Sequence, residues 1–172
     1  MIAAGRAGPW RAAMMTITML ALAGVQTAHA ACIDAPVAQA ARLNEFETLM
    51  MDVSLRCSLV GVVMQPHYDA MVSSHQVRFD AAVQRLQGFF ATGSEPQARH
   101  GGLYDRYATM IANRYGGGST SFDKCRLFDA VAVELARGGD DGRMLAAVAE
   151  AMVRHPVLER ATCPEAPWSL VP

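Results

Sequence analysis

The sequence predicts an all-α protein, an up-and-down bundle of four to five helices stapled by two disulfides. Apolar residues recur at helical spacing through nearly all of the chain, and breaks rich in glycine and proline separate these segments. The chain has 4 cysteines, an even number that suits two bridges. No stretch alternates apolar and polar residues over the length of a useful strand.

The first helix is predicted from Pro36 to about Leu59, and Gly61 ends it. Asp52 and Arg56 stand four residues apart, the spacing of an ion pair on a helix flank. The apolar stripe that predicts this helix consists of Ala40, Leu43, Phe46, Leu49, Met50, Val53, Cys57 and Val60.

The second helix is predicted to begin at Pro66, because proline suits a first helical position. It ends at the stretch "ATGSEPQARHGG", residues 91–102, where glycine, serine and proline break the pattern. Its apolar stripe is Tyr68, Met71, Val72, His75, Phe79, Ala82, Val83, Leu86, Phe89 and Phe90.

Three shorter helices are predicted after that break. The third covers roughly 103–115, and the fourth runs from about Ser121 to Arg137 with Phe122 and Cys125 inward. Asp140 or Asp141 caps the fifth, which ends at His155-Pro156, and the tail from about 156 is predicted to be extended.

The first thirty residues follow the pattern of a secretory signal. Arg6 and Arg11 supply the positive start, and the apolar run 12–25 is shorter than the roughly 20 residues that span a bilayer. The small residues of Ala28-His29-Ala30 predict cleavage after Ala30. We therefore expect a signal peptide at 1–30, one domain at 31–172, no stable membrane anchor after cleavage, and a periplasmic or secreted location.

In an oxidising compartment the cysteines are expected to pair. Cys32 precedes the first helix and Cys57 lies at its far end, about 37 Å away at 1.5 Å per residue, which is too far for a disulfide. In an up-and-down order the fourth helix begins where the first one ends. This favours Cys57–Cys125, and Cys32–Cys163 follows by elimination.

Charge and motifs exclude several classes of function. The formal net charge is −1, and loss of the two signal arginines makes it −3, so no basic face suggests nucleic acid. The chain has no Cys-x-x-Cys, Gly-x-Gly-x-x-Gly, Gly-x-Ser-x-Gly or His-Glu-x-x-His motif, and we expect no cofactor and no catalytic set. Glu45 and Glu47 point to different helical faces and are interpreted as solvated surface.

The stretch "ANRYGGGSTSFDKC", residues 112–125, permits two interpretations. It can be a corner between helices, in which glycine makes the left-handed turn and Thr120 with Asp123 forms a capping box. It can also be an anion site at a helix N-terminus. The candidate ligand-binding residues would then be Asn113, Arg114, Gly117, Gly118 and Ser119.

A stripe of Met64, His67, Met71 and His75 lies on one side of the second helix. Thioether and imidazole groups together are ligands that copper prefers, so His67, Met71 and His75 are candidate metal ligands. The alternative is that methionine fills the core and that His75 is a hydrogen-bonded core histidine.

The segments "SLRC" (54–57) and "ANRYGGG" (112–118), with the later Cys125, resemble a group of small exported proteobacterial helical proteins. Some members carry the name S-adenosyl-L-homocysteine hydrolase. That enzyme is a large cytosolic NAD-dependent protein with a Rossmann fingerprint, which this sequence lacks. The resemblance therefore implies an exported helical protein and does not imply that activity.

These observations favour a non-enzymatic periplasmic bundle that binds a partner protein, an envelope component or a small ligand. One alternative is a copper-binding protein that uses the Met/His stripe. Another is an envelope enzyme with its site near Asn113 and Arg114.

Overall fold

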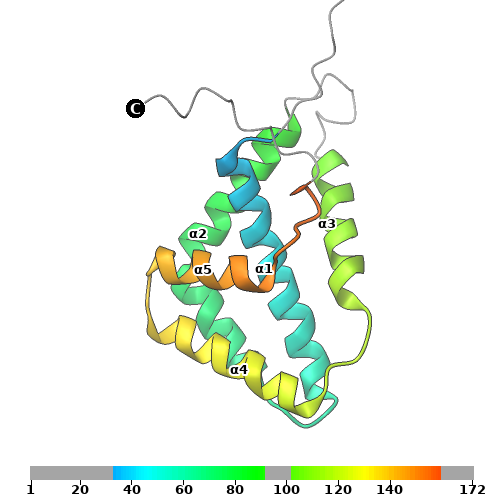
Figure 1. Cartoon of the computed structure of the whole chain (residues 1–172), viewed down its shortest axis with the longest axis vertical. Coiled ribbons are helices and arrows are strands. Elements are labelled where there is room, and N and C mark those ends of the chain that lie inside the picture. The colour runs from blue at the N-terminus through cyan, green and yellow to red at the C-terminus, as the bar shows by residue number, and fades with distance from the viewer. Residues whose placement is uncertain (1–32, 92–101, 160–172) are drawn as a thin grey trace, which may run out of the picture. The chain divides into compact units, whose positions relative to one another are not determined.

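The structure, a computed structural model, describes residues 33–91 and 102–159, all within one compact unit. In these two ranges it contains five α-helices and no β-strand, which confirms the all-α fold class. The predicted signal peptide and the predicted Cys32–Cys163 bridge lie outside the described residues. The helices are α1 (Ala35–Ser58), α2 (Gln65–Ala91), α3 (Gly102–Gly116), α4 (Phe122–Arg137) and α5 (Gly142–Met152) (Figure 1).

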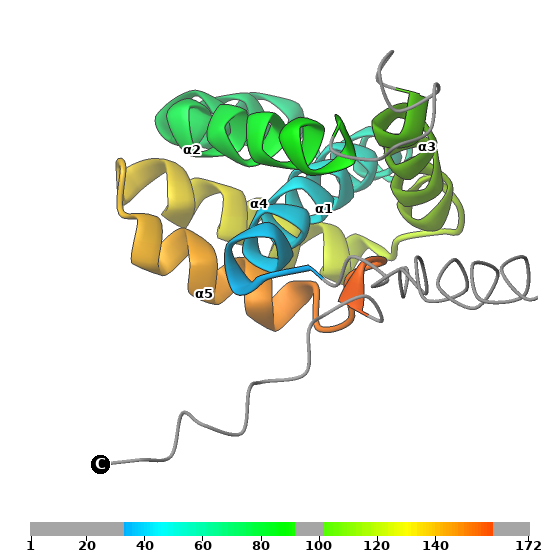
Figure 2. The ribbon, with the colours of Figure 1, turned by 90° about the horizontal axis from the view of Figure 1, so that it is seen from above.

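Helix α1 occupies the centre of the fold and packs against each of the other four helices (Figure 2). For this reason α1 buries side chains on more than one face, including the polar residues Asn44, Glu45 and Ser54. One part of the core surrounds Phe46 and Met50 of α1, and a second part joins α1 to α3. A helix that is covered on several sides cannot show a single clean apolar stripe.

Helices α1, α2 and α3 run alternately down, up and down, whereas α4 runs obliquely at the bottom of the view and α5 lies across α1 (Figure 1). The predicted up-and-down order is therefore seen in the first three helices and not in α4 and α5. Asp141 caps α5 by accepting hydrogen bonds from the backbone N–H groups of Arg143 and Met144. Helix α5 ends at Met152, before the predicted end at His155-Pro156, because Val153 leaves the helical conformation. The carbonyl of Val153 instead accepts a 3.2 Å hydrogen bond from Arg42 Nε of α1.

Two residues predicted to lie in the core, Val60 and Phe122, are exposed instead. Phe122, expected to point inward, is half exposed, whereas Cys125 is fully buried. Phe122 is the first residue of α4, at the end of the bundle, and the bond from Cys125 to α1 determines which face of α4 turns inward.

The interpretation of Glu45 as solvated surface is also wrong. Its side chain is fully buried, Oε2 accepts a 3.0 Å hydrogen bond from the Tyr115 hydroxyl, and Oε1 accepts a 2.6 Å bond from the Val157 N–H. Burial raises the pKa of Glu45, while these two donors and the Arg114 charge oppose that rise. Glu45 therefore joins α1 to α3 and to the segment that follows α5.

Glu47 is partly buried in the α1–α2 interface, where it lines a hollow of about 360 Å³ together with Asp80. Burial raises its pKa, and the neighbouring Asp80 charge raises it further. Unlike Glu45, it accepts no hydrogen bond from another described residue. The prediction of a solvated Glu47 is therefore wrong as well, and its ionised form is disfavoured.

Candidate binding surface

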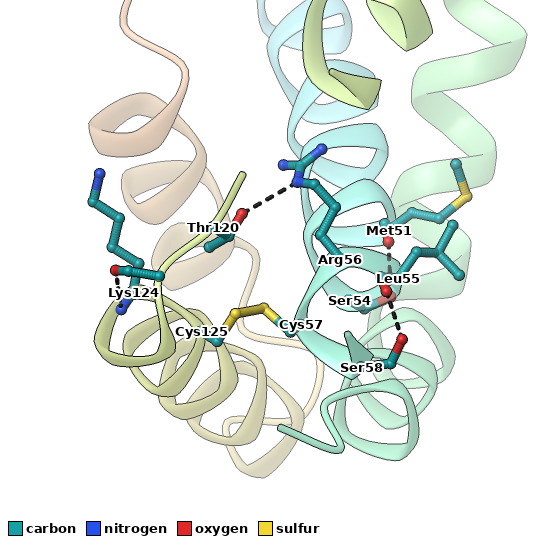
Figure 3. Close-up of a disulfide and its surroundings, with 10 residues drawn as sticks. Met51, Ser54, Leu55, Arg56, Cys57, Ser58, Thr120, Lys124 and Cys125 are labelled. Carbon is teal, nitrogen blue, oxygen red and sulfur yellow. Dashed lines mark hydrogen bonds between the residues drawn. A yellow bond between two sulfur atoms is a disulfide. The ribbon is translucent and has the colours of Figure 1, made fainter. Parts of the chain in front are cut away.

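The end of α1, the loop that follows it, the corner between α3 and α4, and the start of α4 lie together at one end of the fold (Figure 1). We call this region, residues 51–64 and 115–127, the disulfide end. Cys57 and Cys125 are bonded here, with an S–S distance of 2.07 Å and a Cα–Cα distance of 5.5 Å (Figure 3). This bridge confirms the pairing that the alternating helix directions predict.

Helix α1 ends as the sequence predicts, at a glycine in the left-handed region. Gly61 has φ +81°, its N–H donates to the Ser58 carbonyl, and the Val62 N–H donates to the Cys57 carbonyl. This pair of bonds is a Schellman motif. Ser54 Oγ hydrogen-bonds to Gln65 Oε1 at 2.9 Å, which joins the last turns of α1 to the start of α2. The loop between the two helices is thus held at both sides.

The glycine corner contains one residue that requires glycine, Gly118, with φ +92°. The predicted capping box of Thr120 and Asp123 is wrong, because the N-cap of α4 is Ser121, whose side chain accepts from the Lys124 N–H. The Thr120 hydroxyl has a different role and accepts a 3.1 Å hydrogen bond from Arg56 Nε (Figure 3).

Arg56 is the residue that attaches the glycine corner to α1. Besides the bond to Thr120, its Nη1 donates to the carbonyl of Tyr115 at the end of α3. The predicted Asp52–Arg56 contact is not made, because the guanidinium turns to the corner. Asp52 Oδ2 is buried without a hydrogen-bond partner in the described chain. Burial raises the pKa of Asp52, and the Arg56 charge lowers it in part.

We expect Arg56→Ala to lower the free energy of unfolding by about 1–3 kcal/mol, because it leaves the Tyr115 carbonyl and the Thr120 hydroxyl without their donor. Urea unfolding measures the change. Arg114→Ala is the matched control, since Arg114 is exposed and makes no hydrogen bond to another described residue, although its charge acts on Glu45 and its guanidinium lies over the Tyr115 ring. Equal losses in the two variants would contradict the anchoring role of Arg56.

The five candidate anion-binding residues are all exposed, and they divide between two elements. Asn113 and Arg114 lie on α3, with the Arg114 guanidinium 5.6 Å from the centroid of the Tyr115 ring. Gly117, Gly118 and Ser119 lie in the loop that Arg56 holds. The charge of Arg114 interacts with the buried carboxylate of Glu45. Anion binding at this corner stays a prediction.

The predicted Met/His stripe is divided between surface and core. His67 is exposed, and its Nδ1 lies 2.6 Å from Asp129 Oδ1 of α4. Met71 and His75 are buried, and His75 Nε2 lies 3.1 Å from the Leu135 carbonyl, the arrangement of a core histidine. Across the described ranges, no three His, Cys, Asp or Glu side chains are grouped so that they could hold a metal ion. Copper binding by the stripe stays a prediction.

The disulfide end exposes several large apolar side chains, a feature that the sequence analysis missed. Leu59 is 85% exposed and Val63 is 74% exposed, and Leu55 and Val60 are exposed too. Met51 and Leu55 are spaced by four residues and are both exposed on α1 (Figure 3), and Leu59, the C-cap residue of α1, follows at the same spacing. The sequence feature that could have indicated this exposed apolar surface is the stretch 57–66, which contains no charged residue.

Comparison with known proteins finds no matching family model, no similar curated protein and no similar solved structure. The resemblance to small exported proteobacterial proteins therefore stays a prediction. In the part of the chain that the structure describes, no helix combines the length and apolar character needed to cross a membrane.

Proposed function

We propose that this protein is a non-enzymatic binding module of the cell envelope, and that its disulfide end docks onto an apolar surface of a partner protein. The observation that carries the proposal is the exposure of Leu59 and Val63 on a part of the fold that is tightly braced. Exposed apolar groups that lie together are typical of interaction sites. A disulfide is compatible with the oxidising compartment that an envelope protein would occupy.

The energetics favour such docking. Burying one leucine or valine side chain contributes about 1.5–3 kcal/mol, and Leu55, Leu59 and Val63 all have exposed area to bury. Because the stretch 57–66 carries no charge, a partner covers it without removing an ion from water. The Schellman motif, the disulfide and the Arg56 anchor already hold the surface in place, which reduces the entropy lost on binding.

Photocrosslinking tests the proposal in the cells that make the protein. We would replace Leu59 or Val63 by p-benzoylphenylalanine and irradiate. The matched control is Val77 on α2, which is 78% exposed but lies outside the disulfide end. We expect one crosslinked protein from positions 59 and 63 and none from position 77. Adding Leu59→Asp should weaken the crosslink from position 63 by about tenfold or more, because the buried leucine is lost.

Two results would contradict the proposal. Crosslinking of equal yield from position 77 would show that any exposed valine contacts neighbouring proteins. The absence of a crosslinked protein from both 59 and 63, in a variant that melts like the wild type, would show that no partner covers the surface.

A further inference from the structure

A hollow of about 320 Å³ lies between α1, α2 and α5, apart from the disulfide end. Successive turns of α1 from Pro36 to Leu43 form one wall, and successive turns of α2 from Arg78 to Arg85 form the other. The first turn of α5, at Gly142, closes one side. The volume is near the lower limit of small-molecule sites, about 300–1,000 Å³. It therefore suits a small ligand.

The hollow has a cation near each end and small apolar residues between them. Arg78 and Arg85 are two helical turns apart on α2, about 10 Å along the axis. Between them Ala81 and Ala82 are short side chains that leave the space open. An extended molecule could therefore reach both guanidinium groups while its middle rests on the alanines.

The structure orients Arg78 toward its end of the hollow. Its Nε donates to Asp140 Oδ1, and its Nη2 donates to the Asp140 carbonyl at 3.1 Å. Neither of these bonds uses Nη1, which lies over Gly142, where an added Cβ would be 2.2 Å away. The glycine at the start of α5 thus permits the close approach of the guanidinium.

Arg85 is exposed, and within the ranges 33–91 and 102–159 it takes part in no ion pair or hydrogen bond. The charge of Arg78 is partly balanced by Asp140. Hydrogen bonds from the Arg143 and Met144 N–H groups lower the pKa of the neighbouring Asp141, and the Arg78 charge makes a smaller contribution in the same direction. The uncompensated positive charge of the hollow therefore belongs mainly to Arg85, and binding of an anion should depend on it most strongly.

We propose that this hollow binds a small organic dianion, a short aliphatic chain with a carboxylate at each end. One carboxylate meets Nη1 of Arg78 and the other meets Arg85, since planar guanidinium groups recognise carboxylates well. The aliphatic middle packs on Ala81 and Ala82. This site is independent of partner binding at the disulfide end, so either proposal can fail without the other.

The test is a titration of ¹⁵N-labelled protein, followed by NMR, with the dicarboxylates from succinate to suberate and with hexanoate as the monocarboxylate. We expect saturable shifts of the Ala81 and Ala82 amides, with the tightest binding at one chain length. Arg85→Ala should weaken that binding at least tenfold and abolish the preference for a second carboxylate. Ala81→Leu fills the hollow and should abolish dicarboxylate binding.

Arg106→Ala is the matched control, because Arg106 is an exposed arginine of α3 outside the hollow. We expect it to bind like the wild type, and thermal melting establishes that each variant is folded. The proposal is overturned if no dicarboxylate gives saturable shifts. It is equally overturned if hexanoate binds as tightly as the best dicarboxylate, or if Arg85→Ala and Arg106→Ala weaken binding to the same extent.

Discussion

Replacing Cys57 and Cys125 together by alanine is expected to lower the free energy of unfolding by about 4 kcal/mol. The bond joins residues that are 68 positions apart, so it removes a large part of the conformational freedom of the unfolded chain. Both cysteines are fully buried, so small cavities add to the loss. Thermal and urea unfolding of the purified oxidised protein would measure the change.

The double substitution is preferable to reduction, because a reducing agent would act on every disulfide in the chain. Ser58→Ala serves as the control, since the hydroxyl of this exposed neighbour of Cys57 donates only to the Leu55 carbonyl of its own helix. If the double variant unfolds at the same temperature and urea concentration as the wild type, the bridge does not stabilise the packing of α1 against α4. The same variant should also weaken crosslinking from position 63, because the loop loses its bracing.

Glu45→Ala is expected to lower the free energy of unfolding by about 2–4 kcal/mol, because the Val157 N–H and the Tyr115 hydroxyl lose their acceptor in the core. The segment after α5 should loosen first, since Val157 belongs to it. Hydrogen exchange of the Val157 amide should therefore accelerate more than the exchange of amides in α4. Urea unfolding gives the global change.

Glu47→Ala is the matched control for Glu45→Ala on the same helix. Among the described residues Glu47 has no hydrogen-bond donor, and burial and Asp80 raise its pKa. Removing it should leave the protein equally stable or more stable at pH 7. A loss at pH 7 as large as that of Glu45→Ala would contradict the distinction between a satisfied and an unsatisfied buried carboxyl group.

The sign of the pH dependence follows from the raised pKa values. A carboxyl group whose pKa is higher in the folded state contributes most to stability below its unfolded pKa of 4.5, and this contribution is lost as pH rises through the folded pKa. The advantage of Glu47→Ala should therefore be larger at pH 7 than at pH 4. The loss caused by Glu45→Ala should be larger at pH 4 than at pH 7. Opposite trends would show that the folded protein favours the ionised groups.

The glycine corner shows which structural features local sequence patterns can predict and which they cannot. Glycine was expected to end α3 in a left-handed turn, and Gly118 has that conformation because the requirement is local. The predicted cap, Thr120, was wrong because Thr120 and Ser121 are both suitable residues and Ser121 is the N-cap. The choice between them depends on Arg56, which lies 64 positions before Thr120 and binds its hydroxyl.

The sequence alone was sufficient for the five helices and the breaks between them, because helical period and glycine conformation are local. It was also sufficient for the pairing of Cys57 with Cys125, because short connections reverse the chain direction from α1 to α2 and from α2 to α3. Only the tertiary structure decided that Glu45 is buried, with a donor 112 positions away, and that Leu55 and Leu59 are left exposed. Such outcomes depend on which helices meet in space. In its last turns the central α1 is covered on the side of Val53 and Cys57 and open on the side of Leu55, so an apolar side chain is core at Met50 and surface at Leu55.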